Sequence, residues 1–288
     1  MNDAGAFLKT KARAVETALR GRVDSWTGAP PALADATAYS LFAGGKRLRP
    51  ALALGACEMV SGDDRAAMPA ACALEMVHTY SLIHDDLPAM DNDALRRGQP
   101  TLHTIYGEAT AILAGDALLT MAFEAAAECG RADVVRELAR AAGIEGMAGG
   151  QQLDMEAEGH TLTVEALQRV HAKKTGALIR AAVRTGALLG GADNTQLDAL
   201  TRYGEAIGLA FQITDDILNV TGSEAAIGKP VGSDASKAKS TYPALLGLDA
   251  GRARAAATVE SALESLEAFG TEAESFRALA RYITERDR

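Results

Sequence analysis

The sequence predicts an all-α fold, and two observations support that prediction. Ala and Leu are abundant among the 288 residues, whereas aromatic side chains make up only 5% and β-branched side chains are sparse. Ala loses no side-chain entropy in a helix and β-branched side chains are stiff there, so this composition favours helix. Helical periodicity also recurs from end to end in segments of roughly 15 to 25 residues. We therefore expect almost no β-sheet.

Short clusters of Gly, Pro and Asp separate the predicted helices, without long polar linkers. The breaks fall at residues 28–31, 62–64, 97–100, 159–163, 190–194 and 222–234. After the fourth break, Thr163 is a suitable N-cap, and the spacing of three and four residues that follows places Lys174 on the inward stripe. We expect one domain over residues 1–288, with its site between facing helices.

Charge and cysteine content exclude several classes of protein. The formal net charge is −9, with 38 acidic residues against 29 Lys and Arg, and the bases are not gathered as nucleic-acid binding requires. Cys57, Cys72 and Cys129 show neither paired nor CxxC spacing, so no disulfide framework or zinc site is expected. No signal peptide or long uncharged apolar run is recognisable. The expectation is a cytoplasmic protein without a membrane span.

Two clusters of aspartates stand inside apolar helical segments. Their members are Asp85, Asp86 and Asp91 in the first, and Asp215 and Asp216 in the second. Adjacent carboxylates flanked by Leu and Ile repel each other and lose solvation, so they need a cation. Hard oxygen ligands suit magnesium, which takes one or two carboxylates and completes its shell with water and phosphate oxygens. Two such clusters predict a diphosphate held between them.

The two clusters differ in local geometry. In the second, four side chains share one helical face by their spacing: Gln212, Asp215, Asp216 and Asn219. In the first, Pro88 interrupts the helix two residues after Asp86, so Asp91 is expected to come from a helix end or a loop. One such cluster alone is as often a solvated acidic turn, whereas two in one chain are much harder to explain in that way.

Basic residues supply the other half of the predicted site. The stretch Gly44–Pro50, GGKRLRP, places three cations beside paired glycines, which suits a grip on phosphate, although such loops are more often solvated surface. Further bases lie near the glycine breaks or the acids: Arg96, Arg97, Lys174, Lys229 and Lys239. His78 precedes Asp85 by two helical turns and suits an anion donor, although a lone histidine is more often structural. No nucleotide-phosphate motif or catalytic triad is recognisable.

The strings GGKRLRP, SLIHDDLPAMDND, GGQQLD, KKTGALIRAAV and GLAFQITDDILN resemble the trans-isoprenyl diphosphate synthases, most closely the bacterial-type farnesyl diphosphate synthases. The similarity runs from about Gly44 to Arg288, with the motifs in the family's order. It implies an isoprenoid-synthase-type helical bundle around a deep central cavity, built as a homodimer. It also implies a magnesium-dependent prenyltransferase that joins isopentenyl diphosphate to dimethylallyl and geranyl diphosphate, giving farnesyl diphosphate.

The resemblance also implies residue roles. Three magnesium ions per site would be held by Asp85, Asp86, Asp91, Asp215 and Asp216. Isopentenyl diphosphate would be bound by Gly45, Lys46, Arg49, His78 and Arg97. The allylic diphosphate would contact Arg96, Lys174, Lys229 and Lys239. The reaction itself would depend on Lys174, Thr175, Gln212, Asp85 and Asp215, and product length on Tyr80 and Ser81. A basic C-terminus, with Arg286 and Arg288, would help to close the site.

Two features bear on these implied roles. Tyr80 lies roughly 7 to 8 Å along the helix from Asp85, where a ring can block a growing chain. The family usually has Asp where this chain has Asn219, which offers a neutral oxygen without charge. Three alternatives remain, of which the first is a geranylgeranyl diphosphate synthase. The second is a terpene cyclase, and the basic stretch Gly44–Pro50 argues against it. The third is a non-catalytic prenyltransferase subunit, and the two intact acid clusters argue against that.

Overall fold

The computed structural model describes residues 4–221 and 240–285, and within these ranges the all-α prediction is confirmed. The sheet found there is one hairpin of two-residue antiparallel strands, β1 (Leu95–Arg96) and β2 (Gln99–Pro100). It lies at the predicted break 97–100. Gly98 adopts a φ of 75° in the turn, a conformation that glycine reaches without steric cost.

Helices make up most of the described chain. Before the hairpin these are α1 (Ala4–Asp24), α2 (Pro31–Leu41), α3 (Leu48–Ser61) and α4 (Met68–Asp85), with a 3₁₀ turn at Arg65–Ala67. After it come α5 (Leu102–Tyr106), α6 (Glu108–Ala127), α7 (Ala132–Ala142), α8 (Met147–Glu156), α9 (Val164–His171) and α10 (Ala177–Gly190). The last are α11 (Asn194–Thr221), α14 (Tyr242–Leu246), α15 (Leu248–Ser265) and α16 (Glu274–Glu285), with a 3₁₀ turn at Thr271–Ala273.

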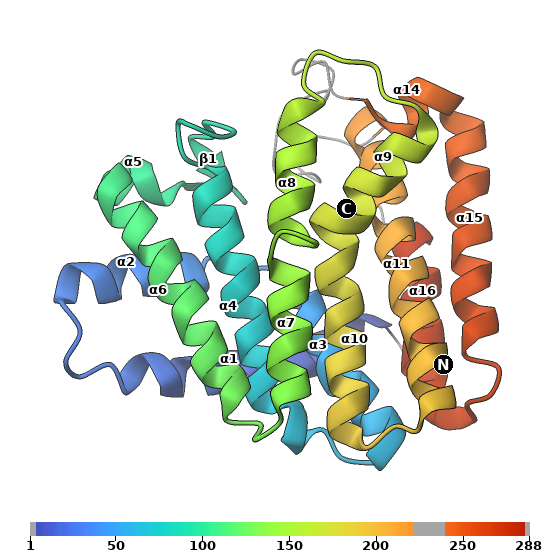
Figure 1. Ribbon diagram of the computed structural model, residues 1–288, viewed down its shortest axis with the longest axis horizontal. Helices are drawn as coiled ribbons and strands as arrows, with labels where there is room; N and C mark the ends of the chain where they lie inside the picture. Colours follow the sequence, from blue (N-terminus) through green and yellow to red (C-terminus); the bar gives the residue numbers. More distant parts are fainter. Residues whose placement is uncertain (1–3, 222–239, 286–288) are drawn as a thin grey trace.

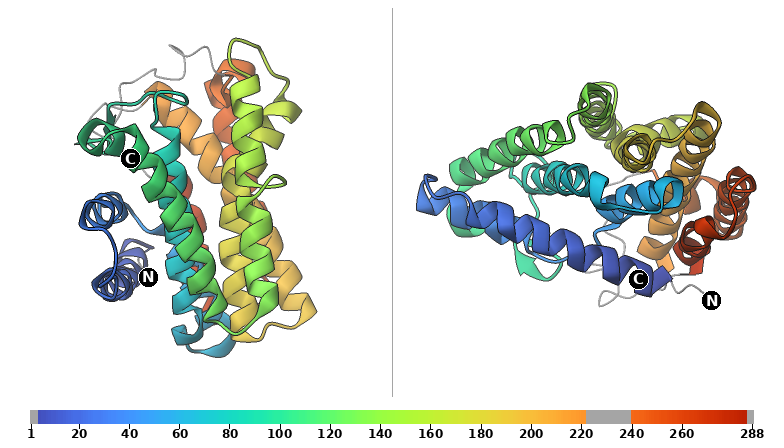
Figure 2. Two further views of the ribbon diagram at one scale, coloured as in Figure 1. Left: turned by 60° about the vertical axis from the view of Figure 1, so that its left-hand side comes forward. Right: turned by 90° about the horizontal axis from the view of Figure 1, so that it is seen from below.

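α3 and α4 run through the middle of the bundle, and the other long helices surround them (Figure 1 and Figure 2). α3 packs against α4 and α10, α4 runs along α6, and α11 lies between α10 and α15. Leu52 and Leu54 on α3 and Leu74 and Met76 on α4 are almost completely buried. A helix that is apolar on all sides is stable only inside a bundle, which explains why these two are central.

The helix predicted after Thr163 is present and contains a widened turn. The Thr163 hydroxyl caps α9 by accepting a hydrogen bond from the Ala166 N–H at 3.2 Å. Between α9 and α10, Ala172–Gly176 forms a π-helical turn. Such turns are rare and are found mostly at functional sites. This one carries Lys174 and Thr175.

α6 has the length and composition of a membrane span, the one such helix in the described part of the chain. Buried helices of water-soluble bundles share these properties, so the observation alone is weak evidence. α6 packs along α4 and α2, and 39% of the apolar stretch is buried. Ile112 and Leu113 remain 43% and 56% exposed on its outer side.

α10 crosses α3 at a very short distance because Gly186 lies at the contact. A Cβ atom at Gly186 would overlap the backbone carbonyl of Ala53 and would lie 2.9 Å from the Ala56 Cβ. The backbone of a buried helix cannot move aside as a flexible side chain can. In contrast, Gly21 is exposed near the end of α1 and has no neighbouring atom within 4 Å of a Cβ position.

We expect Gly186→Ala to lower the free energy of unfolding by about 1–3 kcal/mol, because the added methyl group forces α3 and α10 apart. The matched variant Gly21→Ala should raise it by roughly 0.5–1 kcal/mol, because alanine is the better helix former. Urea denaturation followed by circular dichroism measures both changes. A Gly186→Ala variant as stable as Gly21→Ala would contradict the close crossing.

Candidate active site

The first acid cluster lies where α4 ends. The helix stops at Asp85, as Pro88 predicts, and the chain turns so that the Asp91 N–H donates to the Asp85 carbonyl at 2.8 Å. The expectation that Asp91 comes from a turn is therefore confirmed. Burial raises the pKa of Asp85 to about 6; Lys174 opposes this shift and Asp91 adds to it. The Asp85 carboxylate thus lies near both groups and ionises more easily beside a cation.

Asp86 already has a cation inside the protein. Its side chain is 4% exposed and accepts hydrogen bonds from Arg96 Nε at 2.8 and 2.9 Å and from Arg96 Nη2 at 2.6 Å. β1 holds Arg96 in place for this bidentate contact, and a cavity of about 40 Å³ adjoins both side chains. The two neighbouring aspartates therefore have different surroundings.

In the second acid cluster, too, the two neighbouring aspartates have different surroundings. The predicted helix is confirmed as α11, with Asp215 exposed and Asp216 only 8% exposed. An Asp216 oxygen accepts a hydrogen bond from the Tyr242 N–H at 2.9 Å, at the start of α14. Gln212, one turn earlier on α11, accepts a hydrogen bond from the Thr175 hydroxyl at 3.1 Å. The π turn and α11 are thus joined beside the acids.

Lys174 is paired with a residue to which the sequence patterns gave no role. Its Nζ lies 2.7 Å from Asp154 Oδ2 on α8, and the pair is partly buried. α8 approaches closely because Gly150 faces the π turn, where a Cβ would overlap the Lys174 backbone. Gly150 and Asp154 both belong to the string GGQQLD, one helical turn apart. That spacing was the only signal in the sequence that could have found Asp154.

The basic groups gather as predicted. Burial lowers the pKa of Arg49 to about 10; Glu75 and Asp215 oppose the shift and Arg97 adds to it. Burial, then Arg49 and Arg97, lower the pKa of His78 well below its usual range. His78 is therefore neutral at pH 7 and can donate to an anion through a ring N–H without adding charge.

Glycine allows the basic loop to approach Arg97. Gly45 has a φ of 124°, and a Cβ there would lie only 2.5 Å from Arg97 Nη1. Arg97 Nη1 also donates to the Gly44 carbonyl. Lys46 is exposed, with its Nζ 5.8 Å from the centre of the Tyr282 ring on α16. The loop, the hairpin and α16 thus meet at one place.

Four predicted contributors cannot be placed with these groups. Lys229 and Lys239 lie outside the described residues, as do the C-terminal arginines Arg286 and Arg288. The described part of the chain holds no group of three His, Cys, Asp or Glu residues close enough to bind a metal ion by themselves. The donors nevertheless fit magnesium, which binds few carboxylates and leaves positions for water and phosphate oxygens.

Arg47, within the same basic stretch, serves the fold. It is 3% exposed, has a left-handed φ of 49°, and its Nη1 lies 2.5 Å from Glu75 Oε1. Arg47 Nη2 donates to the Leu41 carbonyl at 2.7 Å. This buried pair fixes the turn between α2 and α3, which carries Lys46 and leads directly to Arg49 in the first turn of α3.

Comparison with known proteins identifies the family of this chain. The model of the polyprenyl synthetase family matches residues 30–280. The chain belongs to the polyprenyl synthetase family. Farnesyl diphosphate synthase of Geobacillus stearothermophilus is 48% identical over 98% of this chain and 97% of its own length. The chloroplastic geranylgeranyl pyrophosphate synthase of Capsicum annuum is 48% identical over 90% of this chain and 72% of its own length.

A solved structure confirms the predicted fold class for this family member. The geranylgeranyl pyrophosphate synthetase of Pyrococcus horikoshii superposes with a TM-score of 0.89 at 31% identity, over 98% of both chains. The recognition of the family from its motifs is thereby confirmed. The relatives include makers of products of different length, so family membership alone leaves product length open.

Arg47→Met should lower the free energy of unfolding by about 3–5 kcal/mol, because Glu75 is then buried without a partner. Adding Glu75→Leu should recover most of that loss. Arg65→Met, which breaks the exposed pair with Asp63, should change stability by less than about 1 kcal/mol. Denaturant titration of the three variants and the parent chain measures these differences. Equal losses for Arg47→Met and Arg65→Met would contradict a structural role for Arg47.

Proposed function

We propose that this prenyltransferase condenses isopentenyl diphosphate with dimethylallyl and geranyl diphosphate and releases farnesyl diphosphate. The observation that carries the proposal is that residues of both acid clusters lie within electrostatic reach of the basic groups. Asp85 at the end of α4 lies within electrostatic reach of Lys174, and Arg49 lies within reach of Asp215. One anion can therefore be held by the acids through metal ions, beside a second held by the bases.

Magnesium would be held by Asp85, Asp91 and Asp215, where it neutralises the diphosphate and the charge that develops as it leaves. Asp86 and Asp216 belong to the same motifs and were expected to share this role. Their contacts with Arg96 and the Tyr242 N–H support a different part for them, which is to fix the ends of α4 and α11 so that the neighbouring carboxylates face inward. Three ions per site remain our proposal.

The allylic substrate is proposed to lie along the π turn. Lys174, oriented by Asp154, binds its diphosphate together with Arg96. The Thr175 and Gln212 oxygens point their dipoles at the allylic carbon and stabilise positive charge there as the carbon–oxygen bond breaks. The family resemblance adds Lys229 and Lys239 to this diphosphate.

The second substrate is proposed to bind at the basic loop. Lys46, Arg49 and Arg97 supply charge to isopentenyl diphosphate, neutral His78 donates a hydrogen bond, and Gly45 keeps the loop close to the anion. The isopentenyl double bond then attacks the allylic carbon, and the proton lost afterwards goes to the departed diphosphate. Holding both substrates in register removes much of the entropic barrier.

We propose that residues 1–288 form a single domain. We also propose that two copies of the chain assemble into a homodimer. The support is an apolar surface on α5 and α6, where Ile105, Ile112 and Leu113 are 49%, 43% and 56% exposed. Large apolar side chains grouped on one face are typical of a protein interface.

Product length is proposed to depend on Tyr80, with Ser81 beside it. The Tyr80 ring packs edge-on against His84 at 5.7 Å between centroids. His84, also on α4, contacts α6: its Nε2 lies 3.1 Å from the Ile112 carbonyl oxygen, and its ring lies against Gly115. The ring is therefore held from behind by a second helix. A fixed ring one and a half turns from Asp85 supports a limit of fifteen carbons.

Turnover should require a divalent metal and both acid clusters. Asp85→Ala and Asp215→Ala are each expected to lower turnover by roughly two orders of magnitude or more, because charge on the leaving diphosphate is no longer neutralised. Asp198→Ala, an exposed position on α11, is the control and should keep full activity. Product formation from radiolabelled isopentenyl diphosphate measures this. Full turnover in excess chelator would contradict the proposed function.

The two diphosphate grips should be separable. Arg49→Ala is expected to raise the Michaelis constant for isopentenyl diphosphate by about tenfold or more, with a smaller change for geranyl diphosphate. Steady-state kinetics with each substrate varied in turn measures the split, and far-ultraviolet circular dichroism checks that the variant is folded. Equal effects on both Michaelis constants would remove Arg49 from the isopentenyl site.

Tyr80→Ala should still consume allylic substrate but release products of twenty carbons or more. Removing the ring opens volume for another isoprene unit and takes away no group that binds diphosphate. Chromatography of the dephosphorylated products measures chain length, with Tyr106→Ala, an aromatic residue away from α4, as the control. If the Tyr80→Ala enzyme makes only the fifteen-carbon alcohol, the ring does not limit the chain.

A further inference from the structure

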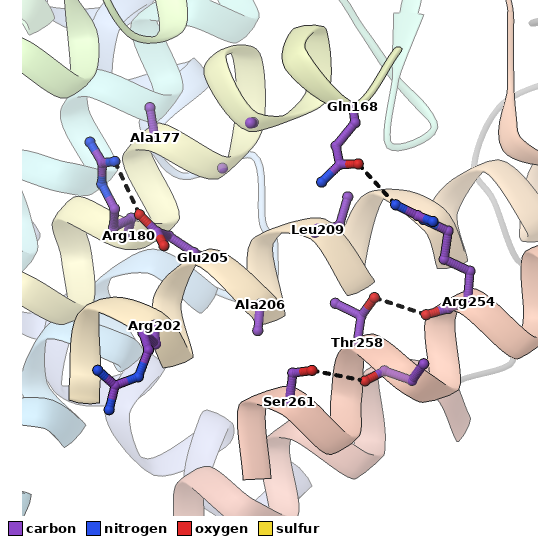
Figure 3. A pocket seen from close by; sticks show the side chains of 13 residues that line it. Gln168, Ala177, Arg180, Arg202, Glu205, Ala206, Leu209, Arg254, Thr258 and Ser261 are labelled. Carbon is purple, nitrogen blue, oxygen red and sulfur yellow. Dashed lines mark hydrogen bonds and ion pairs between the residues drawn. The ribbon is translucent and has the colours of Figure 1, made fainter. Parts of the chain in front are cut away.

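A groove separate from both acid clusters lies between the π turn, α11 and α15 (Figure 3). Its volume of about 560 Å³ falls within the range of small-molecule sites. Part of its wall is apolar, formed by Ala172, Gly176, Ala206, Leu209 and Ala257, and polar side chains form the rest. None of the aspartates in the two acid clusters lines it. The reaction proposed above gives this groove no role.

Three helices each contribute an arginine to the groove: Arg180 from α10, Arg202 from α11 and Arg254 from α15. Arg180 pairs with Glu205, with 3.4 Å between Nη1 and Oε1, and Arg254 Nη2 donates to the neutral Gln168 side chain at 2.9 Å. These contacts are drawn in Figure 3. The three arginines thus line one groove from three separate helices.

The groove carries more positive than negative charge. Among the described residues, no carboxylate forms an ion pair with Arg202 or Arg254, and Glu165 influences Arg254 only at longer range. The chain as a whole has a net charge of −9, so a group of arginines with a single paired acid is a local exception. Guanidinium groups of this kind match phosphate and carboxylate oxygens.

The groove and the proposed catalytic face lie on opposite sides of the π turn. Ala172 and Gly176 line the groove, whereas Lys174, between them in the chain, reaches Asp154 on α8. α8 contributes no residue to the groove. A ligand in the groove would therefore occupy a site of its own and leave the substrate contacts of Lys174 unobstructed.

We propose that this groove binds a small amphipathic anion. Its apolar body lies against the alanines and Leu209, and its phosphate or carboxylate head is held by Arg202 and Arg254. The groove's volume of about 560 Å³ favours a small molecule over a peptide, because a peptide needs a longer surface.

The test is isothermal titration calorimetry on the full chain with decyl phosphate and decanoate as probes. Decan-1-ol has the same chain without charge, and inorganic phosphate is a charged head without the chain. We expect at least one of the two amphipathic anions to bind, and to bind at least about tenfold more tightly than either control probe. The better of the two anions identifies the head group.

Two variants locate the binding. Arg202→Glu reverses a charge at the opening, and Ala257→Phe fills the groove; each should weaken probe binding by about tenfold or more. The matched controls Arg252→Glu and Ala253→Phe lie on α15 outside the groove and should stay within about twofold of the parent chain. Thermal unfolding confirms that all four are folded.

The proposal is overturned by any of three results. The first is that neither anion binds more tightly than decan-1-ol. The second is that inorganic phosphate binds as tightly as the amphipathic anions. The third is that Arg202→Glu and Ala257→Phe bind the probes as the parent does, which would place the binding elsewhere, for instance at the catalytic bases.

Discussion

The site holds several carboxylates close together on α4 and α11, and their mutual repulsion has to be reduced. The bundle reduces it by pairing one aspartate of each adjacent pair with a hydrogen-bond donor from another element. Arg96 neutralises Asp86, the Tyr242 N–H donates a hydrogen bond to Asp216, and Asp154 orients Lys174. Each of these contacts is partly or fully buried, so it is screened little by solvent. These contacts reduce the charge repulsion around Asp85 and Asp215, the carboxylates that we propose face the substrate, although Asp91 still raises the pKa of Asp85.

The π turn between α9 and α10 determines which of its side chains face the proposed substrate site and which face the outer groove. An α-helix would place residues three and four apart on the same stripe, but a widened turn changes that register locally. Here it points Lys174 at α8 and Thr175 at Gln212, while Ala172 and Gly176 line the groove beside α15. The same five residues therefore form the wall between the proposed substrate site and the outer groove.

Much of this arrangement was predictable from the sequence, because its signals are local. Periodicity and glycine breaks located the helices, and Pro88 predicted both the end of α4 and the position of Asp91 in a turn. What could not be predicted depends on contacts between distant segments. The Asp154–Lys174 pair joins residues that are 20 apart in the sequence. The burial of the Arg47 side chain depends on its left-handed backbone conformation and on its ion pair with Glu75. The groove is formed by the surfaces of separate helices.

The same need to limit repulsion between carboxylates explains the amide side chain of Asn219. It lies one helical turn after Asp215 on α11, where a second aspartate would add a like charge and destabilise the pair. Because Asp216 is already occupied by the Tyr242 N–H, Asp215 is the one carboxylate of this motif that is exposed. An amide at position 219 supplies an oxygen without the repulsion. In the proposed function, metal binding at this end of the site would therefore depend more heavily on the first cluster, where Asp85 lies beside Asp91, and on the phosphate oxygens of the substrate.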